Sequence, residues 1–209
     1  MSFPSFFADA PRLKVRDPLS AFLGTSEGGI LEYGYEDAVR LAGHSCPAVA
    51  GAYLMVLNGL GYLHDEEMPE RGGIEVFMRG ERDQGTTGVL ASVATLLTGA
   101  APETGFGGIG PAQRFSRRDL LHFGADIEGT MALRRRDTGA GVVIDIDTGA
   151  VPHALAMGGL MPQAVAGEAD EAELESFAAL WQDRVRRMLI EHADDPKLIH
   201  LYDWSPDEA

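Results

Sequence analysis

The chain has 209 residues, 45% of them hydrophobic, and a formal net charge of -15. This length suits one domain with extensions, and the acidic balance disfavours nucleic acid or an anionic membrane as a partner. The single cysteine excludes an internal disulfide and a cluster held by several thiolates of this chain. We expect a cytoplasmic protein that does not enter membranes, because neither a signal-peptide pattern nor an apolar run of membrane-spanning length is visible.

The first half of the chain is predicted to contain two consecutive helices. Residues 1–34 are interpreted as an N-terminal extension that docks on the body through phenylalanine and leucine side chains. A helix is expected over 35–42, with acidic residues in its first turn and Gly43 at its end. The next helix begins at Pro47, and its apolar residues recur at helical spacing as far as Leu60.

Strands and one more helix follow in the middle of the chain. We expect a strand over 74–78, a helix over 86–97 and a long glycine-rich loop over 99–110. Three further strands are predicted as a meander, over residues 119–123, 128–136 and 141–147.

The C-terminal part is predicted to consist mainly of one long helix. Residues 149–167 look irregular, because they combine two prolines with several glycines. The helix is expected over 170–192, with an apolar stripe, acidic residues at its start and arginines towards its end. Residues 194–209 are interpreted as a partly ordered tail.

The sequence Gly43-His44-Ser45-Cys46-Pro47 is the most informative stretch for function. With Pro47 at the first helical position, Cys46 becomes the N-cap residue, where unpaired N–H groups and the helix dipole favour a thiolate. In an extended turn, His44 points to the same side as Cys46. Thiolate and imidazole suit a metal ion, although a lone Cys and a nearby His are often simply buried or hydrogen-bonded side chains.

This helix start resembles the His-x-Cys-Pro motif of the FmdE family, named after a component of formylmethanofuran dehydrogenase. The resemblance covers residues 35–150 and includes Gly51 and Tyr53 of the helix that follows. It implies an α+β fold with a helix–strand–helix unit followed by three antiparallel strands, in a mixed sheet with helices on one face, plus a C-terminal helix. The element order read from the residues agrees. The implied division is a 1–34 extension, a 35–167 domain, and a 168–209 helix and tail.

The resemblance implies metal binding, commonly of zinc, with His44 and Cys46 as ligands. Two positions depart from the family pattern. A second cysteine of the family aligns with Ala100, and an Asp and a Gln of the preceding helix align with Ser92 and Thr95. A metal bound by this chain therefore needs other ligands or keeps open, water-filled positions.

Three other side chains are candidates to complete a metal site, which needs three or four protein ligands. His153 is the first, because it follows the last predicted strand in a loop; the alternative is a surface histidine. Asp83 and His122 are further candidates. Their alternatives are a helix cap for Asp83 and a partly packed ring for His122.

Three kinds of function fit these residues. The first is a zinc protein that binds or transforms a small molecule at an open metal position. The second is a non-catalytic accessory protein that carries a metal or, less expectedly, a haem-type cofactor. The third is a protein without metal that has a reactive thiolate at a helix start. The sequence leaves open whether the chain is an enzyme.

Two other features suggest partners. The apolar N-terminal segment and the amphipathic last helix lie outside the motif region, and either can bury surface in a homodimer. The loop at Gly105–Gly110 is followed by Arg114, Arg117 and Arg118, which can cradle an anion with the backbone N–H groups. The alternatives are a mobile loop and arginines that pair with the many acidic residues.

Overall fold

A computed structural model describes residues 3–205. The largest unit is a five-stranded sheet in the order β4-β3-β5-β6-β7, and the N-terminal part forms a separate two-stranded sheet of β1 and β2. The strands are β1 (Leu13–Arg16), β2 (Ile30–Tyr33), β3 (Ile74–Met78), β4 (Leu121–His122), β5 (Met131–Arg135), β6 (Gly141–Ile146) and β7 (Ile199–Trp204). The helices are α1 (Pro18–Phe22), α2 (Tyr35–Ala42), α3 (Pro47–His64), α4 (Thr87–Thr98), α5 (Met157–Ala166) and α6 (Glu171–Arg186).

The predicted α+β class with a mixed sheet is confirmed, and one pairing differs from the expected meander. β5 and β6 are antiparallel, but β4 lies on the other side of β3 and runs parallel to it. A parallel neighbour needs a long crossover connection. Here α4 and the glycine-rich loop after it supply that connection. The strand expected over 119–123 is shorter in the structure, where β4 is a two-residue strand at the edge of the sheet.

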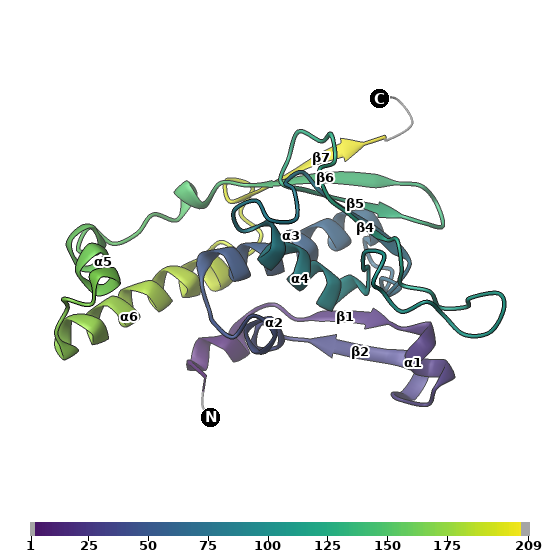
Figure 1. The fold of residues 1–209 in the computed structure, drawn as a ribbon, viewed down its shortest axis with the longest axis horizontal. Coiled ribbons are helices and arrows are strands. Elements are labelled where there is room, and N and C mark those ends of the chain that lie inside the picture. The colour runs from purple at the N-terminus through teal and green to yellow at the C-terminus, as the bar shows by residue number, and fades with distance from the viewer. Residues whose placement is uncertain (1–2, 206–209) are drawn as a thin grey trace.

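The helices α3 and α4 form the middle layer of the molecule, between the large sheet and the β1–β2 hairpin (Figure 1). Most residues of α3 are buried, as expected for a helix that is apolar on nearly all sides. The core that forms around it also includes Phe7, Leu13 and Val15 from the N-terminal segment. Within the described residues, no helix combines the length and the apolar character that crossing a bilayer requires.

Three segments contain regular structure that the sequence did not predict. The residues expected as a tail include β7, which pairs with β6 along its whole length. The stretch 149–167 contains α5 in spite of Pro162 within the helix, and residues 1–34 contain the β1–β2 hairpin. The last long helix lies as expected, with Asp170 and Glu173 forming a capping box and a π-helical turn at its end.

Candidate functional site

The turn between α2 and α3 has the predicted geometry. Gly43 ends α2 in the left-handed conformation, with φ 77°. Cys46 is the N-cap of α3, and its Sγ accepts a hydrogen bond from the Val49 N–H at 3.5 Å. Because Pro47 occupies the first turn, the helix begins directly after the cysteine, and the sulfur lies at the positive end of the helix dipole.

Ser45, the residue between the histidine and the cysteine, is fixed by four hydrogen bonds. Its hydroxyl lies 3.0 Å from the Tyr35 hydroxyl and donates to Gln182 Oε1 at 2.9 Å. Its carbonyl accepts from Trp181 Nε1 and from Gln182 Nε2, both at 3.1 Å. The turn is therefore held between α2 and α6. Sequence reasoning missed all three partners of Ser45.

His44 and Cys46, on either side of Ser45, both remain accessible. His44 is exposed, and its Nδ1 lies 3.0 Å from the Ala42 carbonyl oxygen. A neutral ring that donates from Nδ1 leaves Nε2 free as a metal ligand. Cys46 is half-buried and packs at the margin of the core, with its thiol free. The pair thus offers one nitrogen and one sulfur from a fixed turn.

His153 lies near this turn but is engaged elsewhere. Its ring centroid is 6.1 Å from that of Trp181, which donates to Ser45. Its Nε2 lies 2.5 Å from Arg184 Nη1. A guanidinium has only donors, so Nε2 is the acceptor. Burial, together with the charges of Arg184 and Arg187, lowers the pKa of His153. The neutral ring suits a ligand, but its lone pair already accepts a hydrogen bond.

The two further candidates lie in other surroundings. Asp83 is exposed in the turn before α4, whose N-cap is Thr86. His122 lies on β4, with its ring stacked on Phe77 at a centroid distance of 4.7 Å. Among residues 3–205, no group of three or more His, Cys, Asp or Glu side chains is placed to hold a metal ion. The donor types at the turn fit zinc, but two donors do not complete a closed site.

Comparisons with known proteins include a weak likeness in fold. No family model and no curated protein matches the sequence. Among solved structures, the chain is similar to a tungsten formylmethanofuran dehydrogenase FmdE-like protein from Syntrophus aciditrophicus. The two share 16% sequence identity at a TM-score of 0.43, over 84% of this chain and 76% of the other. That solved structure bears the name of the family whose helix start this sequence resembles.

Proposed function

We propose that this chain binds a divalent metal ion, with zinc as the first expectation, through His44 and Cys46. The hydrogen bonding of Ser45 carries the proposal, because it holds an imidazole and a thiol two residues apart on one fixed turn. The N-cap position places the cysteine sulfur beside the first backbone N–H groups of α3. Thiolate and imidazole together are ligands that zinc prefers.

The remaining coordination positions are open in this proposal and would be taken by water or by a small molecule. His153 can join the site only if its Nε2 leaves Arg184, which also donates to the carbonyls of Val151 and Thr148 at 2.7 Å. The proposal therefore names two protein ligands and concerns binding alone. It covers an enzyme and an accessory protein equally.

The proposal predicts that zinc binding depends on Cys46. Wild-type protein, purified without an affinity tag, is expected to hold about one zinc ion per chain. Cys46→Ser and His44→Ala are each expected to weaken zinc affinity by about tenfold or more, since each removes half of the protein ligands. Plasma mass spectrometry of the purified protein and competition with a chromogenic chelator measure both quantities.

His200→Gln on β7 is the matched histidine control and is expected to leave the zinc content unchanged. His153→Gln tests the third candidate ligand in the same assay. Equal zinc content in the wild type and in Cys46→Ser would contradict the proposal. A visible absorption spectrum of the same samples tests the haem-type alternative.

A second candidate function is a reactive thiolate without metal. The N-cap geometry favours it, because reactive cysteines are typical of helix starts and the hydrogen bond from Val49 N–H to the cysteine sulfur needs no metal. The alkylation rate of Cys46 by iodoacetamide separates the two functions. Zinc slows alkylation if the metal occupies the sulfur, and it has no effect on a thiolate that binds no metal.

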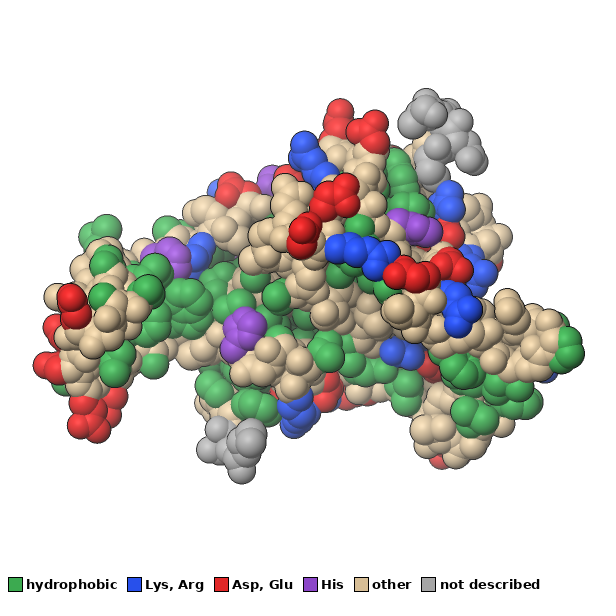
Figure 2. Space-filling view, viewed as in Figure 1, with side chains coloured by type: hydrophobic (Ala, Val, Ile, Leu, Met, Phe, Trp, Pro, Cys, Tyr) green, Lys and Arg blue, Asp and Glu red, His purple; other side chains and the backbone are tan. Residues whose placement is uncertain are grey.

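We also propose a homodimer that forms through an arm of the molecule, made of α5 and the first half of α6 (Figure 1). Hydrophobic side chains gather on this arm, with acidic groups near its tip (Figure 2). Leu155, in the turn that leads into α5, is fully exposed, and Val165 on α5 is 80% exposed. Two packed helices cover only part of their own apolar surface. A second copy of the chain, related by a two-fold axis, would cover the rest, and this is the commonest symmetry among homo-oligomers.

Sedimentation velocity tests the dimer. The wild type is expected to sediment as a dimer at micromolar concentration, whereas the double variant Leu155→Glu/Val165→Glu is expected to sediment as a monomer, because charge on an apolar interface opposes association. Ile30→Glu, which changes an equally apolar side chain on the hairpin, is the control and should remain dimeric. A wild type that sediments as a monomer would contradict this prediction.

A further inference from the structure

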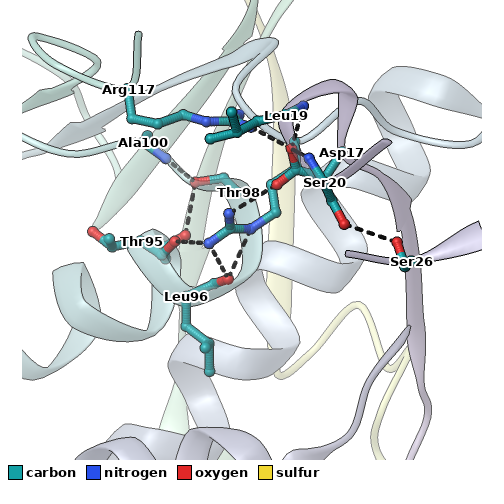
Figure 3. A network of polar contacts seen from close by, with 11 residues as sticks. Asp17, Leu19, Ser20, Ser26, Thr95, Leu96, Thr98, Ala100 and Arg117 are labelled. Atoms are coloured by element: carbon teal, nitrogen blue, oxygen red, sulfur yellow. Dashed lines mark hydrogen bonds and ion pairs between the residues drawn. The ribbon is translucent and has the colours of Figure 1, made fainter. Parts of the chain in front are cut away.

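A buried polar cluster joins the N-terminal hairpin to the loop that follows α4 (Figure 3). At its centre lies Asp17, 3% exposed, which caps α1. Its carboxylate accepts hydrogen bonds from the backbone N–H groups of Leu19 at 2.9 Å and Ser20 at 3.2 Å. It also pairs with Arg117 Nη2 at 2.6 Å and with Arg71 Nη1 at 3.1 Å.

This cluster contains more positive than negative charge. Two guanidiniums share one carboxylate, and Arg117 is only 6% exposed. The other N–H groups of Arg71 donate to the carbonyls of Thr95 and Leu96. The Nε of Arg117, in contrast, is buried and has no hydrogen-bond partner. A buried charged donor without an acceptor is unfavourable, so the contacts within the cluster do not fully satisfy its two arginines.

A pocket of about 280 Å³ opens beside these two arginines and is lined by a third, Arg136. Arg136 donates to the Gly72 carbonyl at 3.1 Å and forms no ion pair with a carboxylate of the described residues. The acid in the lining, Glu70, pairs with Arg16 at 3.1 Å. In a chain with a net charge of -15, this pocket is therefore a cationic spot.

The backbone around the pocket is shaped to present these groups. A Cβ atom at Gly72 would overlap the Arg117 guanidinium, so only glycine lets that side chain lie there. Gln113 and Phe115, which also line the pocket, have φ values of 49° and 63°. Non-glycine residues adopt this conformation at a cost in free energy, and such residues gather at ligand sites.

A larger pocket of about 940 Å³ adjoins the first and shares Glu70, Gly72 and Arg136 with it. Ile30 and Met68 contribute apolar side chains to its lining, and His64, which is 8% exposed, contributes an imidazole. The Nε2 of His64 is buried and has no hydrogen-bond partner. Burial, followed by the charge of Arg135, lowers the pKa of His64 and so disfavours the charged form of the ring. The lining also includes charged side chains, among them Arg16, Glu67 and Asp137, so this space can hold polar as well as apolar parts of an organic molecule.

We infer that this pair of pockets binds a small organic anion, whose phosphate or carboxylate group lies between Arg71, Arg117 and Arg136. Guanidiniums suit this role because their forked N–H groups match the oxygens of both anions. The site shares Arg117 with the cradle expected at Gly105–Gly110 but does not include Arg114, which lies over the rings of Phe22 and Phe115. It is also separate from the turn that carries His44, so it does not depend on the metal proposal.

Calorimetric titration with sodium phosphate and with sodium succinate tests this inference, at constant ionic strength set by sodium chloride. The wild type is expected to bind at least one of them with a dissociation constant of about 1 mM or lower. Arg136→Gln, an exposed residue whose replacement leaves the buried cluster intact, is expected to weaken that binding by about tenfold or more.

Arg114→Gln is the matched control, since it removes an exposed arginine of the neighbouring loop that does not line the pocket. It should bind like the wild type. Binding of phosphate but not succinate identifies a phosphorylated ligand class, and the reverse identifies a carboxylate. The inference is overturned if neither anion binds the wild type, or if Arg136→Gln and Arg114→Gln bind equally well.

Discussion

Replacing Asp17 by Asn is expected to lower the free energy of unfolding by about 3–5 kcal/mol. Asn can still cap α1, so the helix start is kept. It supplies no charge, however, and the guanidiniums of Arg71 and Arg117 lose their carboxylate partner in a buried place. Chemical denaturation with urea, followed by circular dichroism, measures the change.

The loss of stability caused by Asp17→Asn should depend on pH in a defined direction. Burial opposes ionisation of Asp17, but the hydrogen bond from Ser20 and the charges of Arg117 and Arg71 outweigh it, and the pKa lies below its ordinary value of 3.8. Because the pKa of Asp17 is lower in the folded state, its carboxylate stabilises the fold at pH values above the ordinary pKa. This stabilisation is lost as the pH falls through the lower, folded-state pKa. The difference between wild type and Asp17→Asn should therefore be full at pH 7 and shrink below about pH 4.

Glu103→Gln is the control for this prediction, because Glu103 forms an exposed ion pair with Arg82. Surface pairs of this kind contribute little, so its unfolding curve should coincide with that of the wild type. A curve for Asp17→Asn that also coincides with the wild type would show that the buried cluster does not stabilise the fold.

The elements that the sequence predicted well are those specified by local chemistry. Gly43 ends α2 because a left-handed residue is needed there, and Pro47 fixes the start of α3. β7 and β4 are different cases. Each lies at an edge of the sheet and depends on pairing with a strand distant in the chain, Ile199 with Ile146 and Leu121 with Val76. Local periodicity does not report such pairing.

For the candidate site, too, the sequence predicted the local geometry but not the contacts between distant residues. The N-cap position of Cys46 follows from Pro47 alone, and the structure confirms it. The anchoring of Ser45 by Trp181 and Gln182 joins residues more than 130 positions apart, and neither side chain has a chemical signature in the sequence. Likewise, no local pattern indicates that Arg117 turns inward to Asp17 while Arg114 stays outside.

Replacing Gly59 by Val is expected to destabilise the protein by about 1–3 kcal/mol. Gly51 and Gly59 lie two turns apart on α3, on the side that faces the sheet. A Cβ atom at Gly59 would overlap Ile144 on β6 and lie 2.8 Å from Leu133 Cδ1 on β5. The added methyl groups of valine would therefore push the helix away from a tightly packed sheet. Thermal or urea unfolding measures the loss.

Gly61→Ala on the same helix shows why packing, and not helix propensity, decides this outcome. No heavy atom lies within 4 Å of a Cβ built at Gly61, and the residue is exposed. Alanine there should stabilise the protein by up to about 1 kcal/mol, because it restricts the unfolded chain and favours the helix. The two substitutions, at positions 59 and 61 of the same glycine-rich helix, are therefore expected to change the stability of the protein in opposite directions. If Gly59→Val were also stabilising, α3 could not lie as close to β5 and β6 as the structure places it.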